Sequence, residues 1–202
     1  MTEYVKMRIT NSHVYFVSGP FSQWHPSPFS ANLPVLLRND GIAELAPSEQ
    51  RMQFSHAEQA MMAAKASVFG DDETLVAIMA APTPKEQKEL GRRVRNFDTT
   101  VWSAAAYRIV CIMNFEKFKA NPDFKDRLLR TETRHLVEGA WYDRIWGVGL
   151  SWDDPAINDE TNWQGSNWLG EALMAVRTEL ADGDTDRDAW TIARFHNTPP
   201  SR

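Results

Sequence analysis

The sequence predicts a single, compact α+β domain that is mainly helical, with a few short strands near the N-terminus. Its 202 residues are enough to bury one sizeable core. Prolines and glycines interrupt roughly the first fifty residues, whereas apolar side chains recur at helical spacing through most of residues 55–180. We place the domain at residues 1–182 and expect residues 183–202 to form a loosely ordered C-terminal tail.

Two short strands are expected in the N-terminal part, at residues 14–17 and 35–37. The sequence Asn-Asp-Gly at residues 39–41 is a strong turn signal that could close a hairpin. Together these elements supply the β part of the α+β class.

Six helices are expected after the strands. The first spans residues 56–69, where Ser55 and Glu58 have the spacing of a capping box. A second begins at residue 71 or 72 and ends before Pro82. The third has Pro84 in its first turn, which favours helix initiation, and runs to about residue 95. The others are predicted at residues 99–119, 122–130 and 165–180.

Composition and charge exclude several classes of protein. Lys and Arg total 22 and Asp and Glu total 27, and the resulting net charge of −5 argues against sequence-independent binding to long nucleic acid. No run of eighteen apolar residues predicts a membrane span, and no N-terminal signal pattern is present. The single cysteine, Cys111, excludes an intramolecular disulfide and favours the reducing cytoplasm. The five histidines lack ligand spacing, so no metal is expected.

Residues 136–149 combine carboxylates with aromatic side chains. Glu138 and Asp143 are close in sequence to Trp141 and Trp146. Because acidic side chains are rarely buried without a partner, this mixture favours a lined pocket. Such a pocket could stack a flat base and stabilise the positive charge that develops on a sugar as a glycosidic bond breaks. The alternative is that both carboxylates cap a helix or point to water, and this segment alone does not decide between the two.

Glu58 and Lys65 are seven residues apart and project from nearly the same face of the first predicted helix. A buried carboxylate with a raised pKa could act as an acid or a base. The lysine could bind phosphate, or attack a sugar aldehyde as a nucleophile. Taken alone, these residues favour the plainer alternative, in which Glu58 completes the capping box and Lys65 is solvated.

Two further pairs could contact an anion. Lys88 and Arg92 share a helix face and could hold a phosphate, although a charged face is more often simply solvated. Asn167 and Gly170 fall in the first turn of the last predicted helix, where free backbone N–H groups favour anions and a small residue admits a ligand. Capping of that helix by Asn167 is the alternative. Trp102, which opens the fourth helix, could belong to the core or to a surface pair.

Several motifs occur in a specific order along the chain. They are Gly19-Pro-Phe-Ser-Gln-Trp24, Phe54-Ser-His-Ala-Glu-Gln-Ala-Met-Met-Ala-Ala-Lys65, Lys88-Glu-Leu-Gly-Arg92, Trp102, Leu136-Val-Glu-Gly-Ala140, Asp143, Trp146-Gly-Val-Gly149 and Trp163-Gln-Gly-Ser-Asn-Trp-Leu-Gly170. With this order and spacing the chain resembles the NADAR family, also called YbiA-like proteins, from about residue 15 to residue 180.

The resemblance implies a single YbiA-like domain that acts as an N-glycosidase without a metal or cofactor. Its substrates would be ribosylated or ADP-ribosylated small molecules and bases, including riboflavin-pathway intermediates and DNA that carries ADP-ribose on guanine. It implies that Glu58, Lys65 and Asp143 are catalytic, with Glu58 the leading carboxylate and Lys65 able to form a transient imine with an opened ribose. The residues implied to bind substrate are Phe21, Ser22, Trp24, Arg92, Trp102, Glu138, Trp146, Gly147, Asn167 and Gly170.

Departures from the family pattern lie around the expected pocket and leave the substrate open. Gln23 replaces the usual Asn of the first motif, and Ser166 and Trp168 flank Asn167 where Lys and Leu are common. The main alternative is therefore a protein that binds ADP-ribose-type nucleotides without cleaving them. The net charge of −5 leans towards small-molecule substrates over DNA. The sequence leaves the oligomeric state open.

Overall fold

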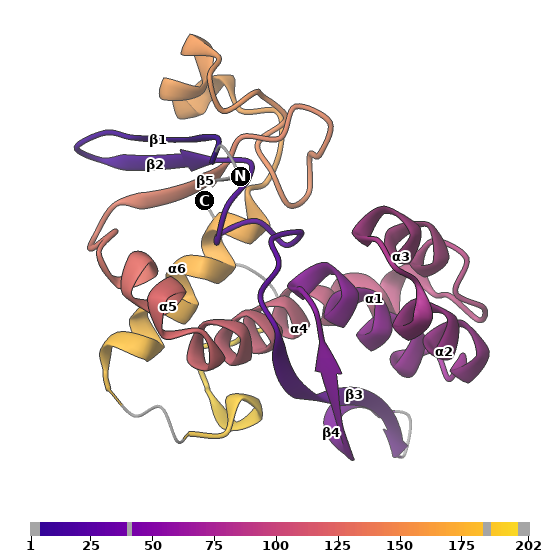
Figure 1. Ribbon diagram of the computed structural model, residues 1–202. Helices are drawn as coiled ribbons and strands as arrows, with labels where there is room; N and C mark the ends of the chain where they lie inside the picture. Colours follow the sequence, from indigo (N-terminus) through magenta and orange to yellow (C-terminus); the bar gives the residue numbers. More distant parts are fainter. Residues whose placement is uncertain (1–4, 40–41, 184–186, 198–202) are drawn as a thin grey trace.

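The computed structural model describes residues 5–39, 42–183 and 187–197, and it confirms a mainly helical α+β fold (Figure 1). The strands form two separate sheets. β1 (Met7–Ile9) pairs antiparallel with β2 (His13–Phe16), and β2 pairs parallel with β5 (His135–Glu138). β3 (Phe29–Asn39) and β4 (Ile42–Phe54) form an antiparallel hairpin.

Both predicted N-terminal strands are present, and the second is part of the much longer strand β3. The central residues of the predicted turn, 40 and 41, lie outside the described residues. The strands on either side of them are paired, with Asn39 opposite Ile42. β5 was not predicted, because only four residues pair and they belong to a segment that was interpreted as a pocket lining.

The helices within the described residues follow the predicted order. They are α1 (Ala57–Val68), α2 (Asp72–Ala80), α3 (Pro84–Gly91), α4 (Thr99–Ala120), α5 (Pro122–Leu129) and α6 (Trp168–Ala181), with short 3-10 turns η1 (Pro155–Asn158), η2 (Glu160–Asn162) and η3 (Ala189–Thr191). Side-chain caps fix several starts: Asp98 accepts from two backbone N–H groups of α4, and Thr83 accepts from the first turn of α3.

α4 is the central element of the core (Figure 1). It packs against α1, α6 and β3, and most of its residues after the first turn and a half are buried. Ile109, Ile112 and Phe115 are fully buried along it. A helix covered on several sides carries apolar residues around much of its circumference, which explains why its apolar residues repeat so densely in the sequence.

Two helix ends differ from the prediction. α3 ends at Gly91 instead of near residue 95, because Arg95 turns back to Asp71: its backbone N and its Nη2 donate to the carboxylate at 2.8 and 2.6 Å. α6 begins at Trp168 instead of residue 165, because Asn167 adopts the left-handed conformation, with φ of 52°.

Part of the C-terminal tail is packed, so the expectation of a loose tail is wrong for residues 187–197. Trp190, Ile192 and Phe195 are buried, and the Phe195 ring meets the edge of Phe115 on α4 with centroids 5.9 Å apart. Arg194 also donates to the buried carboxylate of Glu179 at 2.7 Å. Burial of three large apolar side chains offsets the conformational entropy that ordering the segment costs.

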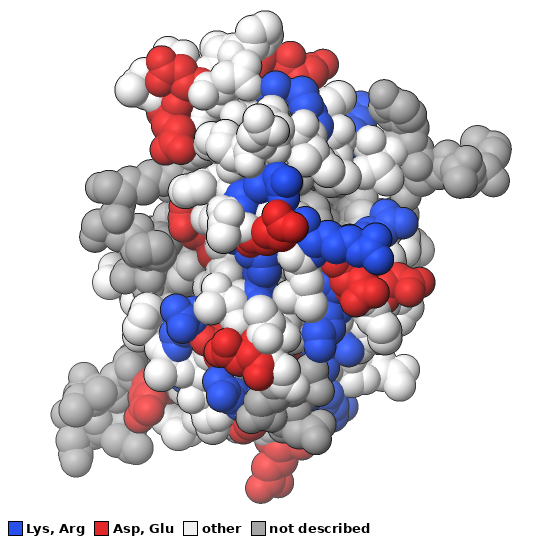
Figure 2. All heavy atoms as spheres, turned by 90° about the vertical axis from the view of Figure 1, so that its left-hand side faces the viewer, with Lys and Arg blue, Asp and Glu red and all other residues white. Residues whose placement is uncertain are grey.

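The face that carries β1, β2, α5 and α6 bears both charges among the described residues. Acidic and basic side chains are interspersed there (Figure 2). Among the helices of the described residues, none is both long enough and apolar enough to span a bilayer.

Candidate active site

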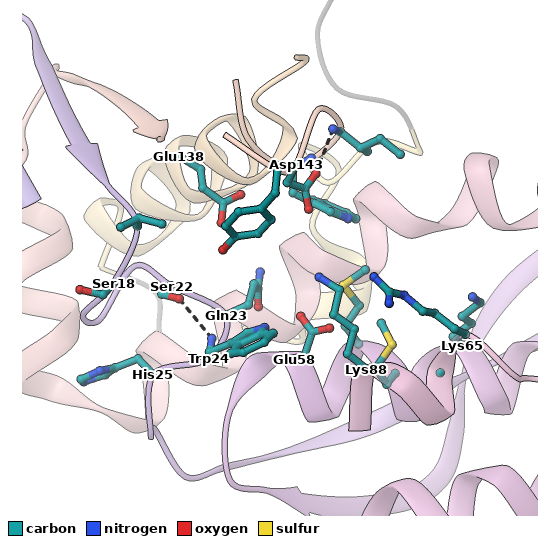
Figure 3. Close-up of a pocket in the computed structure, with 18 of the residues that line it drawn as sticks. Ser18, Ser22, Gln23, Trp24, His25, Glu58, Lys65, Lys88, Glu138 and Asp143 are labelled. Carbon is teal, nitrogen blue, oxygen red and sulfur yellow. Dashed lines mark hydrogen bonds between the residues drawn. The ribbon is translucent and has the colours of Figure 1, made fainter. Parts of the chain in front are cut away.

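A cavity of about 520 Å³ lies where segments distant in sequence meet. Its walls come from the loop after β2, from α1, from the C-terminal half of α3, from the start of α4 and from the segment that follows β5 (Figure 3). The volume falls within the range typical of small-molecule sites.

The loop after β2 is held in place by hydrogen bonds, one of them from the buried side chain of Lys117. Gly19 takes a positive φ of 81°, and the Ser22 N–H donates to its carbonyl at 2.9 Å. Lys117 of α4 is fully buried and donates from Nζ to the Ser22 carbonyl at 3.0 Å. The backbone N–H of Glu58 donates to the Gln23 carbonyl at 2.9 Å. The loop is therefore fixed to both α4 and α1.

The start of α1 differs from the predicted capping box, and the difference frees Glu58. The N-cap is His56, whose Nδ1 accepts from the Gln59 N–H at 3.2 Å. Gln59 Oε1 in turn accepts from the N–H and hydroxyl of Ser55 at 2.8 and 2.9 Å. Ser55 and Glu58 therefore do not cap the helix together: His56 caps it, and the Gln59 side chain bonds back to Ser55.

Glu58 points into the cavity and is only 4% exposed (Figure 3). Burial raises the pKa of its carboxyl group, and Asp143 raises it further. Lys88 and a hydrogen bond from Trp24 oppose that rise. Its Oε1 has no hydrogen-bond partner within the protein. A buried oxygen of this kind is available to a ligand or a water molecule.

Glu138 and Asp143 approach the cavity from the opposite side (Figure 3). Burial, with the charge of Asp143 second, raises the pKa of Glu138 to about 8. Glu138 Oε2 also lacks a partner within the protein. Asp143 Oδ1 accepts from the backbone N–H groups of Ile145 and Trp146 at 3.0 and 2.8 Å, which fixes its orientation. Glu138 is thus a protonated, donor-capable group at neutral pH.

Three cations also line the cavity. Lys88 and Arg92, four residues apart, both line it, as does Lys65. Burial, and then the positive charge of Arg92, lowers the pKa of Lys65. The Lys65 Nζ lies 4.1 Å from the ring centroid of Phe97 and 5.6 Å from that of Trp102. Together these cations suit an anionic group such as phosphate.

Aromatic rings complete the walls. Trp24, Trp102, Tyr142 and Trp146 all line the cavity. Trp146 is held by an edge contact with Trp168, at 5.6 Å between centroids. Trp24 and Tyr142 are 44% and 65% exposed, so they offer ring surface to a ligand at the mouth.

The structure brings together most of the residues predicted for the site. Those that line the cavity are Ser22, Trp24, Glu58, Lys65, Arg92, Trp102, Glu138, Asp143 and Trp146. Phe21, Gly147, Asn167 and Gly170 do not line it. Phe21 is instead a core residue that packs on Phe16 and Phe118.

Asn167, Gly147 and Gly170 lie behind the cavity wall and hold the backbone segments that form it. The Asn167 side chain accepts from the Glu138 N–H at 3.0 Å and donates to the Leu136 carbonyl at 2.8 Å, so it ties β5 to α6 and does not cap the helix. A Cβ on Gly170 would collide with the Leu136 carbonyl, and a Cβ on Gly147 would lie 2.9 Å from the Glu138 carbonyl. Close backbone approach accounts for both glycines.

Several lining residues were not among the predicted site residues, including Gln23, His25 and Tyr142. Lys88, which the sequence suggested as a phosphate contact because it lies one helical turn before Arg92, also lines the cavity. Tyr142 lies inside the aromatic segment that indicated a pocket. Gln23 stands in the first motif at a position where it replaces the usual Asn.

Fold and cavity together define a compact α+β protein with a ligand-sized site that is lined by carboxylates, cations and aromatic rings. Residues 13–181 match the family model described as the NADAR domain, and the chain therefore belongs to the NADAR family. This confirms the resemblance drawn from the motifs.

Curated relatives and a solved structure agree with this assignment. The chain is 39% identical to N-glycosidase R617 of Acanthamoeba polyphaga mimivirus over 79% of this chain and 86% of the relative. It is 36% identical to Protein irg-1 of Caenorhabditis elegans over 87% and 77%, and 33% identical to N-glycosidase Npun_R5314 of Nostoc punctiforme over 51% and 59%. The NMR structure of the E. coli protein YbiA superposes with a TM-score of 0.63 at 20% identity over 92% of this chain and 94% of that one, which shows a common fold.

Proposed function

We propose that this protein is an N-glycosidase that hydrolyses the bond between a phosphoribosyl or ADP-ribosyl group and a base or amine. The observation that carries the proposal is the convergence of Glu58, Glu138 and Asp143 on one aromatic-walled cavity that also contains cations. Two relatives are named N-glycosidases, which supports this reaction class.

The carboxylates can divide the work of breaking the bond. As the bond between C1′ and the base nitrogen breaks, its electron pair goes to the base, and neutral Glu138 can supply the proton that the leaving nitrogen takes up. Positive charge then develops on the ribose, where the carboxylate of Asp143 can stabilise it and hold ribose hydroxyls. Glu58 can orient a water for attack at C1′ and accept its proton. Glu58 then releases its proton to solvent and Glu138 takes one up from solvent, which restores both groups.

Cations and aromatic rings would bind the rest of the substrate. Lys88 and Arg92, which line the cavity, would hold phosphate, and Trp24 and Tyr142 would offer ring surface for the base. Lys65 fits two roles. It can bind phosphate as a cation, or its lowered pKa can make it a nucleophile that forms an imine with the opened ribose, to be released by water.

Within this reaction class we propose a small phosphorylated ribosyl metabolite as the substrate, with ADP-ribosylated DNA as the second candidate. The net charge of −5 favours the small molecule. A cavity that encloses a single nucleoside-sized group is compatible with either, provided that a modified base in DNA is extruded into it.

The test is base release from a panel of substrates, followed by chromatography with mass detection. The panel contains ADP-ribose conjugates, NAD, riboflavin-pathway ribosylamines and DNA oligomers with ADP-ribosylated guanine. Wild type should release base from at least one of them, and Glu58→Gln should be slower by about 100-fold or more. Glu89→Gln, the same change at an exposed position of α3 outside the cavity, should retain wild-type rates.

One result would overturn the role of Glu58, and another would overturn the proposed reaction class. Undiminished turnover by Glu58→Gln would remove Glu58 from the chemistry. Tight, stabilising binding of a panel member with no base released on long incubation would identify a nucleotide-binding protein that does not cleave its ligand.

A further inference from the structure

The side-chain amide of Gln23 is buried, and neither its nitrogen nor its oxygen makes a hydrogen bond within the protein. The residue is 8% exposed, and both Nε2 and Oε1 are buried without a hydrogen-bond partner in the protein. Figure 3 shows this amide in the cavity, in the same view as Glu58 on one side and Glu138 on the other. Because buried polar groups in folded proteins are nearly always hydrogen-bonded, the partners of this amide must come from the contents of the cavity.

The backbone that carries this amide is fixed on both sides. The preceding carbonyl, that of Ser22, accepts from Lys117 Nζ at 3.0 Å, and the carbonyl of Gln23 itself accepts from the Glu58 N–H at 2.9 Å. Both clamps are made by buried residues. The amide is therefore presented from a rigid support that is joined directly to the residue with the leading catalytic role.

A carboxamide has a donor and an acceptor side by side in one plane. It pairs with any flat edge that shows the complementary acceptor and donor side by side. Two kinds of base edge do so: a lactam, with a C=O next to a ring N–H, and an amidine, with an amino group next to a ring nitrogen. Trp24, the next residue, lines the same cavity and offers a ring against which such a base can lie.

We propose that Gln23 is a specificity-determining residue whose amide pairs with the donor–acceptor edge of the base that is released. This inference rests on the proposed N-glycosidase function and narrows its substrates to bases that possess such an edge. A base without that edge leaves the buried amide unpaired, and buried groups left unpaired are the strongest source of discrimination between similar ligands.

The test measures binding of matched nucleotide pairs by calorimetry, with chromatography afterwards to verify that the ligand is intact. For the lactam edge the pair is inosine monophosphate and its N1-methyl derivative. For the amidine edge it is adenosine monophosphate and its N6,N6-dimethyl derivative. Wild type should prefer the unmethylated member of at least one pair by about tenfold or more, since two hydrogen bonds are lost. The pair that is discriminated identifies the kind of edge.

Gln23→Met separates hydrogen bonding from size. Methionine has a similar volume but no donor or acceptor, so the preference should fall to within about threefold, whereas a preference caused by the bulk of the added methyl group would survive. Gln23→Asn keeps the amide and should retain the same preference at reduced strength. Gln53→Met, at an exposed position of β4 outside the cavity, should bind as wild type does.

Folding of the variant can be verified independently. Removing two unpaired buried polar atoms should leave the melting temperature of free Gln23→Met equal to or above that of wild type. If Gln23→Met does not fold, Gln23→Asn still decides: loss of the preference in a protein that retains an amide and unfolds cooperatively would overturn the inference.

The outcomes distinguish this inference from the proposed function. Base release by wild type together with unchanged discrimination by Gln23→Met would overturn the role of Gln23 alone. Discrimination that depends on Gln23, in a protein that releases no base from any substrate, would overturn the N-glycosidase proposal alone. If wild type discriminates neither pair, water fills the space at the amide and the inference fails.

Discussion

Three carboxyl groups share one cavity, and at the scale of the residue their proximity decides which of them carries a proton. Burial and the charge of Asp143 raise the pKa of Glu138 to about 8, and Asp143 also adds to the rise in the pKa of Glu58. Because the three carboxyl groups interact, a measured pKa describes the titration of the three groups together. Glu138 is the group best suited to donate a proton at neutral pH.

Activity should therefore fall as the pH rises through about 8, because Glu138 then loses the proton that the leaving base requires. Glu138→Gln should lower kcat/KM at pH 7 by about 100-fold or more and abolish the alkaline limb. The measurement is kcat/KM between about pH 5.5 and 9.5. An unchanged alkaline limb in the variant would assign the proton to another group.

The two roles of Lys65 make different predictions. Lys65→Arg keeps the positive charge near Phe97 and Trp102 but cannot form an imine. If Lys65 only binds phosphate, Lys65→Arg should retain most of the activity that Lys65→Met loses. If it forms an imine, both variants should lose about 100-fold or more. Borohydride should then fix a ribosyl adduct on wild type only, detectable by peptide mass spectrometry.

Lys117 links the site to the pH dependence of stability. Burial lowers its pKa to about 7, so between about pH 7 and 10 the unfolded chain binds a proton that the folded chain does not. The folded state should consequently gain stability as the pH rises through this range. Between pH 8 and 9.5 the free energy of unfolding of wild type should increase by about 1–2 kcal/mol relative to Lys117→Met. Urea unfolding of both proteins measures it, and parallel curves would contradict a neutral buried lysine.

At the scale of the element, the end of β5 and the start of α6 are joined by close backbone contact. Gly170 lies against the Leu136 carbonyl, and Asn167 bonds to both Leu136 and Glu138. The position of Glu138 in the cavity therefore depends on this junction, even though neither Asn167 nor Gly170 lines it.

Gly170→Ala should destabilise the protein by about 2–3 kcal/mol, although alanine is the better helix former, because the added methyl group forces the two backbones apart. Thr178→Ala, at an exposed position of the same helix, serves as the control and should change stability by less than about 0.5 kcal/mol. Chemical denaturation compares the two. A neutral Gly170→Ala would show that the junction is loose.

The helices were predicted well because each has a local signal. Pro84 and the dense apolar repeat of α4 fix their helices without reference to the rest of the chain. The start of α1 was displaced by one residue because a histidine, an uncommon cap, takes the role assigned to Ser55. β5 was missed because its pairing with β2 joins segments more than a hundred residues apart, and such pairing leaves little trace in a short strand.

At the scale of the whole molecule, the cavity exists only because segments from residue 17 to residue 146 converge. Most of the site residues that the resemblance to a family implied line the cavity, since the motifs mark the segments that meet. The resemblance did not separate residues that face the cavity from residues behind it. Asn167 and Ser22 belong to equally clear motifs, but only the fold shows that the Asn167 side chain is hydrogen-bonded to backbone groups. The buried contact between Lys117 and the Ser22 carbonyl had no local signal.

The salt dependence of activity distinguishes the small-molecule substrate from the DNA substrate. For a small nucleotide held by two or three cations, kcat/KM should fall by less than about tenfold between 50 and 200 mM salt. A DNA substrate bound through six or more phosphates would lose about a thousandfold over the same range. A steep dependence would favour DNA, in conflict with the preference drawn from the net charge of −5.

The most direct test of the central claim is the stoichiometry of products formed by wild type from a substrate of the panel. An N-glycosidase should release free base and ribosyl product in equal amounts, and Glu58→Gln should release both more slowly by about 100-fold or more. Cleavage that yields phosphate or nucleotide fragments while the base stays attached to ribose would contradict the account, because the three carboxyl groups would then serve a different reaction.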